Sequence, residues 1–211
     1  MKRKLIVALV AATALAAGVA SAQAGDIIDE WANVKAPAAP ELKPVTVDNK
    51  TDALLVIDMV NQTCNAKARP RCVETIPAIQ KLLNDARAKG MTVIYSLGPA
   101  GNDFVEALAP KNGEPIVKSG ADKFVNTELE KMLKDKGITS VIVVGTLANG
   151  GVLHTASQAA LRGFKVVVPV DGMSSQNANT LYSEQYTAWH LANGPGLSAK
   201  VTLTKTDMIK F

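Results

Sequence analysis

Aromatic residues, cysteine and long apolar runs are all scarce in this sequence of 211 residues. Phe, Trp and Tyr make up only 4% of it, which argues against a surface that binds nucleic acid by stacking bases on aromatic rings. Two cysteines are too few for a small domain that depends on many disulfides. With 47% hydrophobic and 20% charged residues, the chain is neither a disordered tail nor a fibre. Its length is typical of one globular domain with a substantial core.

The first 24 residues have the pattern of a secretory signal peptide. Three basic residues at positions 2–4 precede an apolar run over residues 5–19, and the small residues at 20–24 offer a cleavage site. The alternative is a permanent membrane anchor, but a run of 15 residues is too short to span a bilayer comfortably. No second apolar stretch of spanning length follows. The sequence therefore predicts an exported protein, periplasmic or secreted.

Signal cleavage also changes the charge of the chain. Cutting after Ala24 takes 24 of the 211 residues and three of the 23 basic side chains. The remaining 187 residues carry 20 basic and 19 acidic side chains, a net charge of +1. Such a surface has no long-range field that would attract nucleic acid or anionic lipid. We expect neither as a partner, and no stable membrane anchor after cleavage.

Both cysteines, Cys64 and Cys72, lie in the predicted mature chain with seven residues between them. In an oxidising compartment this spacing suits a small loop closed by a disulfide. Two free thiols, or a reactive Cys64, are the alternatives. No neighbouring histidine and no CxxC spacing supports a metal or redox site. The sequence favours the disulfide.

The mature chain divides into an arm and a domain. Residues 25–50 are rich in Pro and Ala with little periodicity, which predicts an irregular arm. Over residues 51–211, apolar runs typical of buried strands alternate with amphipathic stretches. The expected strands are 53–57, 91–95, 140–144, 165–170 and 201–204, and the expected helices are 76–89, 126–136, 151–162 and 183–192. Because parallel strands need covering crossover helices, this order predicts an α/β fold, a three-layer α-β-α sandwich around a parallel sheet.

Candidate site residues follow the apolar runs, since open parallel sheets bind ligands at the carboxyl ends of their strands. Asp58 follows one run, Lys118 follows the short run 115–117, and Asp171 ends another. An Asp58–Lys118 pair would be either a structural ion pair or an acid/base device. The turn at 145–151 leads into a helix whose first amides could bind an oxyanion or a carboxylate. That turn matches neither GxxxxGK[ST] nor GxGxxG, so it is no nucleotide loop of those types.

Several of these strings together resemble a known family. They are Leu54-Leu55-Val56-Ile57-Asp58-Met59-Val60-Asn61, Val117-Lys118, Phe124, Thr127-Glu128-Leu129, Val141-Ile142-Val143-Val144-Gly145, Thr155-Ala156, Ala159-Ala160 and Gly163-Phe164-Lys165-Val166. In this order they are similar to the isochorismatase-like hydrolases, also called the cysteine hydrolase superfamily. The resemblance runs from about Asp52 to the C-terminus. It implies a parallel sheet of six strands and a homo-oligomer.

The resemblance also implies an Asp–Lys–Cys triad, of which the cysteine is missing here. It places the Asp at Asp58, the Lys at Lys118 and the nucleophile at Gly151, and no cysteine follows Cys72. Covalent attack by a thiolate, as in nicotinamidase or carbamoyl hydrolase chemistry, is therefore not expected. The metal-binding Asp/His cluster of nicotinamidases has no counterpart in residues 59–68, so we expect no metal and no cofactor.

Three functions remain open. Isochorismatases of this family also carry glycine at the cysteine position and cleave a vinyl ether. By analogy, Asp58 would act as the acid, Lys118 as its electrostatic partner, and the amides near Ala148 and Gly151 would line a pocket for a small-molecule substrate. The rival is a catalytically inactive small-molecule-binding protein, which export favours because isochorismate is intracellular. A third possibility is an assembly module.

The remaining candidates are weaker. Ala148, Asn149 and Gly150 form the turn before the helix and are candidates for substrate binding. His154 lies three residues into that helix, close enough to face the pocket, although helical histidines are more often structural. His190 stands beside Trp189 and suits packing or a subunit contact. Two histidines so placed make no zinc site. Residues 97–113 would wall the pocket.

Overall fold

The computed structural model describes residues 25–176 and 180–211. The predicted signal peptide, residues 1–24, lies outside them. The chain divides into two compact units after Ala38. In the first, residues 25–38 contain one 3-10 turn, η1 (Trp31–Asn33), and expose large apolar side chains, among them Ile27 and Trp31. Within the described ranges, no helix has the length and apolar character that crossing a membrane requires.

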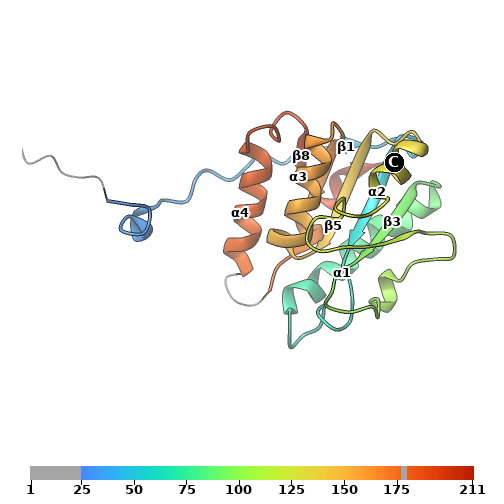
Figure 1. Cartoon of the computed structure of the whole chain (residues 1–211), viewed down its shortest axis with the longest axis horizontal. Coiled ribbons are helices and arrows are strands. Elements are labelled where there is room, and N and C mark those ends of the chain that lie inside the picture. The colour runs from blue at the N-terminus through green and yellow to red at the C-terminus, as the bar shows by residue number, and fades with distance from the viewer. Residues whose placement is uncertain (1–24, 177–179) are drawn as a thin grey trace, which may run out of the picture. The chain divides into compact units, whose positions relative to one another are not determined.

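The second unit is built on a parallel sheet, as the sequence predicted (Figure 1). Its main path has the order β4-β3-β2-β5-β6-β8, and the short strand β7 adds a seventh by pairing with β5. The strands are β2 (Asp52–Ile57), β3 (Thr92–Leu97), β4 (Ile116–Lys118), β5 (Ser140–Thr146), β6 (Lys165–Pro169), β7 (Met173–Ser174) and β8 (Val201–Thr204). The central strands β2 and β5 are buried along their whole length, which explains their unbroken aliphatic sequences.

Helices cover both faces of this sheet. They are α1 (Pro70–Ala88), α2 (Leu129–Asp135), α3 (Leu153–Leu161) and α4 (Thr180–Asn193), with a π-type turn η3 (Ala148–Val152) leading into α3. Short 3-10 turns are η2 (Glu106–Leu108), η4 (Val170–Gly172) and η5 (Thr206–Met208). The sequence predicts a helix start at Gly151. The π-type turn begins at Ala148, but Gly150 within it has a non-helical backbone (φ −125°, ψ −105°), so continuous helical backbone starts at about the predicted residue.

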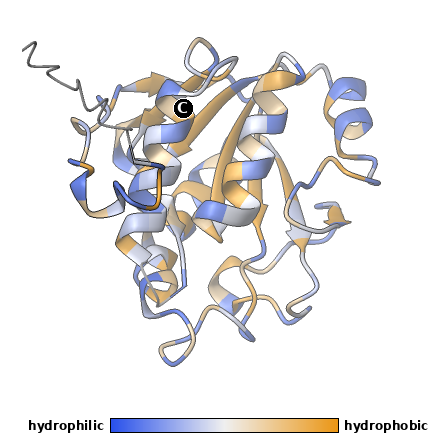
Figure 2. Cartoon of the chain, turned by 60° about the vertical axis from the view of Figure 1, so that its left-hand side comes forward, coloured by the Kyte–Doolittle hydropathy of each residue, from blue (hydrophilic) through white to orange (hydrophobic). Residues whose placement is uncertain are grey.

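Alternate residues of β2 belong to two separate cores. Leu54 and Val56 lie in the core that contains Leu83 of α1. Leu55 and Ile57 lie in the core that contains residues of α2, α3 and α4. Successive side chains of a strand point to opposite faces, so the sheet has an apolar layer on each side. Figure 2 shows this pattern, with hydrophobic strands inside and mixed colouring on the helices. The three-layer α-β-α sandwich is confirmed.

Part of the expected arm belongs to the domain. Strand β1 (Val45–Thr46) pairs in parallel with β9 (Ile209–Lys210) in a small second sheet. The buried Val47 donates its N–H to the carbonyl of Lys210 at 2.8 Å. From the sequence the domain is expected to begin at residue 51, whereas the second compact unit of the structure begins after Ala38. Two-residue strands carry too little periodicity to be found from sequence.

The expected disulfide is present between Cys64 and Cys72. It closes the loop that connects the carboxyl end of β2 to the first turn of α1. Both half-cystines are buried within the α1 core. The alternatives of two free thiols or a reactive Cys64 do not hold in this structure.

Candidate active site

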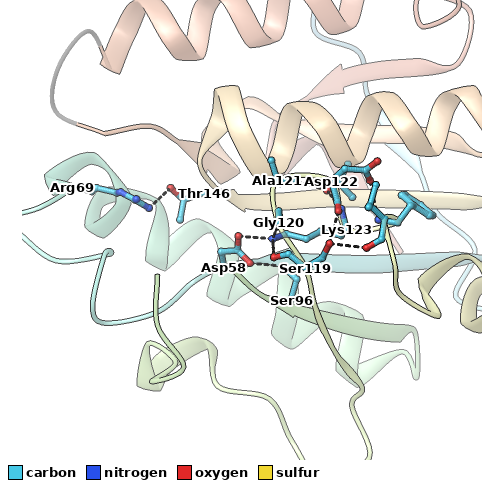
Figure 3. A network of polar contacts seen from close by, with 12 residues as sticks. Asp58, Arg69, Ser96, Ser119, Gly120, Ala121, Asp122, Lys123 and Thr146 are labelled. Atoms are coloured by element: carbon cyan, nitrogen blue, oxygen red, sulfur yellow. Dashed lines mark hydrogen bonds and ion pairs between the residues drawn. The ribbon is translucent and has the colours of Figure 1, made fainter. Parts of the chain in front are cut away.

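Asp58 stands at the carboxyl end of β2, in the middle of the sheet between β3 and β5. Its backbone is left-handed, with φ of 51°. Its Oδ1 accepts a hydrogen bond from Ser96 Oγ of β3 at 2.7 Å, and its Oδ2 accepts one from Lys123 Nζ at 2.7 Å (Figure 3). The side chain keeps 20% of its surface exposed. The carboxylate is therefore fixed in position by two donors and still open on one side.

Lys123 is the positive partner of Asp58. Its side chain is fully buried. The ammonium also donates to the carbonyl oxygen of Gly120 at 2.6 Å and makes a longer contact of 3.5 Å with that of Ser119. The three ammonium hydrogens thus have three acceptors, which offsets the cost of burying the charge. The group is a fixed cation held against one oxygen of the carboxylate.

The expectation that Lys118 pairs with Asp58 is wrong. Lys118 ends β4, its side chain is exposed, and it makes no hydrogen bond or ion pair with any described residue. Strand β3 lies between β4 and β2, so the end of β4 does not face Asp58 directly. The loop after β4 instead returns toward β2 and brings Lys123 inward. Both lysines stand in one short segment, and only the path of this loop distinguishes them.

Two glycines lie against the free side of the Asp58 carboxylate. A Cβ at Gly98 would stand 2.9 Å from Asp58 Oδ2, and a Cβ at Gly151 would stand 3.5 Å from the same atom. A side chain at position 151 would thus point at the carboxylate. It would also meet Ile57 Cγ2 at 2.6 Å, so this space is partly filled. Gly151 leaves Oδ2 accessible to a small molecule where a larger residue would cover it.

A cavity of about 620 Å³ opens at the ends of β3 and β4. Gly98, where a Cβ would meet Asp58 Oδ2, is part of its wall, whereas Asp58 and Gly151 are not among the lining residues. The other lining residues are Leu97, Pro99, Gly101, Asn102, Lys118, Ser119 and Gly120. The expected wall, residues 97–113, therefore does contribute to the cavity. Lys118 also belongs to the cavity wall, although it is not the partner of Asp58.

The turn after β5 is tightly held against β2. Gly145 has φ of +120°, and a Cβ there would come within 2.1 Å of the Ile57 carbonyl oxygen, so only glycine fits. The candidate substrate-binding residues of this turn lie in different environments. Ala148 is buried in the core, and Gly150 stands against Leu147. Asn149 is exposed and accepts a hydrogen bond from Ser175 Oγ at 2.8 Å.

His154 is exposed on the first turn of α3, and no described contact joins it to Asp58 or Lys123. Its expected role in substrate binding stays a prediction. Asp171 has a structural role, because its two oxygens accept hydrogen bonds from Thr206 N and Oγ1. His190 packs against the ring of Tyr186 at 5.7 Å. Among the described residues no cluster of three or more His, Cys, Asp and Glu could hold a metal.

Arg69 is a site residue that the sequence analysis missed. It immediately precedes α1, and its Nη1 donates to Thr146 Oγ1, at the end of β5, at 3.3 Å (Figure 3). The side chain is half-buried. Burial lowers the pKa of this guanidinium, and the negative charge of Asp58 partly opposes that effect. No sequence signal identified it, because a lone arginine in a polar loop is normally a solvated residue.

The isochorismatase domain profile matches residues 52–194, most of the second unit. The chain belongs to the isochorismatase family. The match includes Asp58, Lys123 and Gly151, the three residues that meet at the end of β2.

Relatives of this isochorismatase family member have several described activities. It is 28% identical to the "Secreted isochorismatase effector Isc1" of Verticillium dahliae, over 64% of this chain and 78% of the relative. It is 31% identical to the "Streptothricin hydrolase" of Streptomyces noursei, over 66% of this chain but only 58% of that protein. The chain therefore spans little more than half of the second relative.

Solved structures of the family share its fold. An isochorismatase-like hydrolase from Alkaliphilus metalliredigens superposes with a TM-score of 0.66 at 27% identity, covering 74% of this chain and 95% of the other. Proteins named as hydrolases are thus among those that this family member resembles in sequence and structure.

Proposed function

We propose that this chain is a hydrolase of a small molecule that works without a covalent intermediate. Asp58 acts as the acid/base, and Lys123 is its electrostatic partner. The observation that carries this proposal is the position of Asp58 Oδ2, which is bound to Lys123 and which a Cβ at Gly98 or Gly151 would approach. The family's hydrolases support the same reaction class.

The reaction needs one water molecule, one proton given by Asp58 and one proton returned to it. Asp58 in its acid form gives its proton to the substrate, at the alkene carbon of a vinyl ether or at the leaving atom of an ester or amide, while water adds to the electrophilic carbon. The carboxylate takes back a proton from the added water, and the bond between that carbon and the leaving oxygen or nitrogen breaks. In a vinyl ether the leaving oxygen takes its proton from the hydroxyl of the hemiketal. Lys123 stabilises the carboxylate that forms between the two transfers, and Ser96 holds its orientation.

No thiol takes part in this scheme. Position 151, where the family resemblance places the nucleophile, is glycine, and the only two cysteines of the chain are joined in a disulfide. Glycine has no nucleophilic atom, so water is the attacking group. Vinyl ethers, in which a proton on carbon activates the leaving group, suit an acid without a covalent partner.

The second candidate is a catalytically inactive binding or assembly protein on the same fold. One observation favours it: Ile57 Cγ2 partly fills the place of a side chain at position 151. In this case the Asp58–Lys123 pair would hold the end of β2 together and have no chemical role.

Export belongs to this proposal as well, as does the homo-oligomer that the family resemblance implies. The N-terminal 24 residues support export, and one relative is named a secreted effector. Cleavage would release the domain into the periplasm or the medium, where its disulfide would be stable.

A substrate panel separates the enzyme from the binder. The purified mature protein is incubated with vinyl ethers, esters and amides, before and after treatment with iodoacetamide, and its intact mass is followed by mass spectrometry. We expect hydrolysis of at least one class above the buffer rate, no loss of rate after alkylation, and no covalent adduct during turnover. Reversible binding by calorimetry without hydrolysis of any class would favour the binder. An accumulating adduct would contradict the non-covalent mechanism.

A further inference from the structure

Arg69 is held rigidly at the entrance to α1. Its N–H donates to the Asn65 carbonyl at 2.8 Å, and its own carbonyl accepts from the N–H of Cys72 at 3.0 Å. It also lies inside the loop that the Cys64–Cys72 disulfide closes. Little backbone entropy would be lost if the side chain bound a ligand, because this loop is already fixed.

The guanidinium of Arg69 has unused hydrogen-bonding capacity. An arginine offers five N–H donors, and within the described part of the chain this one makes a single hydrogen bond, the 3.3 Å contact to Thr146 Oγ1. The other three described arginines each pair with a carboxylate: Arg71 with Glu184, Arg87 with Glu114, and Arg162 with Glu130. Arg69 is thus a half-buried cation that lacks the anion its counterparts have.

The position of Arg69 is on the opposite side of Asp58 from Lys123. Strand β2 lies between β3 and β5. Ser96 of β3 and Lys123 of the loop after β4 bind the Asp58 carboxylate, whereas Arg69 contacts Thr146 of β5, on the other side of Asp58 in Figure 3. Ile57 of β2 is in register with Gly145 of β5, so Asp58 and Thr146, the residue that Arg69 contacts, follow at neighbouring strand ends. A molecule bound at Asp58 Oδ2 could extend along the end of β5 to the guanidinium.

A second unpartnered group lies on the same strand ends. The Ser174 side chain of β7 is fully buried, and its Oγ has no hydrogen-bond partner among the described residues. Ser174 is in register with Thr146 of the neighbouring parallel strand. Side chains in register on parallel strands point to the same face of a sheet, so both hydroxyls lie on one face. A buried hydroxyl without a partner is costly, and a polar ligand would relieve that cost.

We propose that Arg69 binds a carboxylate of the substrate, so that the site is selective for small carboxylic acids. This inference rests on the proposed function only in calling the ligand a substrate. The planar guanidinium matches the two oxygens of a carboxylate through a bidentate pair. Asp58 would repel an anion placed beside it, so the carboxylate lies at the Arg69 end and the scissile bond lies near Asp58.

Equilibrium binding tests the inference without any turnover. Acetate, succinate and benzoate are compared with acetamide, succinamide and benzamide by calorimetry at low salt, on the wild type and on the Asp58→Asn variant. We expect at least one acid to bind roughly tenfold or more tightly than its amide, a difference of about 1.4 kcal/mol. Arg69→Met should abolish this preference, and Arg69→Lys should restore part of it. A wild type that binds no acid more tightly than its amide would overturn the inference.

Lys118 provides the competing explanation, because it is the exposed cation in the cavity wall. If Lys118→Met removes the preference for acids and Arg69→Met does not, the proposal is wrong. If inorganic phosphate binds more tightly than every acid, and Arg69→Met abolishes this binding, the assignment to carboxylates is wrong. Thermal unfolding of each variant shows whether the fold survives the substitution.

The same variants distinguish this inference from the proposed function. Once a substrate is known, its acid and amide forms are compared in turnover, and we expect Arg69→Met to raise KM for the acid far more than it lowers kcat. Binding of acids through Arg69 without hydrolysis would support the inference and contradict the hydrolase. Hydrolysis that is equally fast for acid and amide, and unchanged in Arg69→Met, would contradict the inference alone.

Discussion

Removing Lys123 tests the ion pair at the centre of the site. Lys123→Met keeps most of the buried stem and deletes the charge, and Asp58→Asn deletes the opposite charge. Breaking a buried pair by removing one partner costs about 3–5 kcal/mol of unfolding free energy. Asp58 keeps its hydrogen bond from Ser96 and 20% of its surface exposed, so we expect the lower end of this range, about 3 kcal/mol, for Lys123→Met.

The double variant isolates the interaction between the two groups. Each single variant leaves one unpaired ion, whereas the double variant leaves none, so the double substitution should cost less than the sum of the two single ones. We expect a coupling free energy of about 2 kcal/mol, within the range for groups in direct contact. Urea unfolding at pH 7, followed by circular dichroism, measures the free energies of all four proteins.

Lys118→Met is the matched control for this cycle. Lys118 stands five positions before Lys123, and its side chain makes no hydrogen bond with a described residue. Its coupling to Asp58→Asn should therefore stay within about 0.5 kcal/mol of zero. A larger coupling for Lys118 than for Lys123 would refute the assignment of the pair.

Three further predictions follow from contacts around the site. Replacing Cys64 and Cys72 with alanine should lower the free energy of unfolding by about 2–3 kcal/mol, because the loop they close is short. Urea unfolding of the variant and of the wild type measures this difference, and equal stability of the two proteins would contradict the prediction. Gly98→Ala should displace the Asp58 carboxylate and reduce ligand affinity at the site, whereas Gly120→Ala, whose methyl meets nothing within 4 Å, should have a much smaller effect in the same titration. Burial raises the pKa of Glu114, but the hydrogen bonds from Arg87 and from the Lys111 N–H, together with the positive charges of both residues, outweigh this and leave the pKa below its usual value. The stabilising contribution of the Glu114 carboxylate is therefore present above about pH 4.3 and lost as the pH falls further. Between about pH 5 and 3, the free energy of unfolding of Glu114→Gln should therefore decrease less than that of the wild type. An equal decrease in both proteins would contradict this prediction.

The architecture could be predicted well because burial leaves a direct mark on sequence. Strands such as β2 and β5 are buried on both faces, so they appear as unbroken aliphatic runs. Asp58 was found by the same logic, since it is the first polar residue after such a run. The disulfide followed from cysteine count and spacing in a chain with an export signal.

The partners of Asp58 could not be predicted in the same way. Lys118 and Lys123 are both lysines close to one strand end, and the choice between them depends on how the loop after β4 turns back. Arg69 reaches the site because α1 begins beside the end of β5, which is a property of the folded chain. Loop paths and contacts between distant segments leave no periodic pattern in sequence.

We propose that the Asp58 carboxylate drives hydrolysis by this chain. Its most direct test is the ratio of kcat/KM between the wild type and Asp58→Asn, on the best substrate of the panel. Asp171→Asn is the matched control, because that carboxylate lies shortly after the end of β6 and, among the described residues, its hydrogen bonds come from Thr206. The account predicts a loss of at least about 100-fold for Asp58→Asn and less than about threefold for Asp171→Asn. Equal rates for Asp58→Asn and the wild type would contradict it.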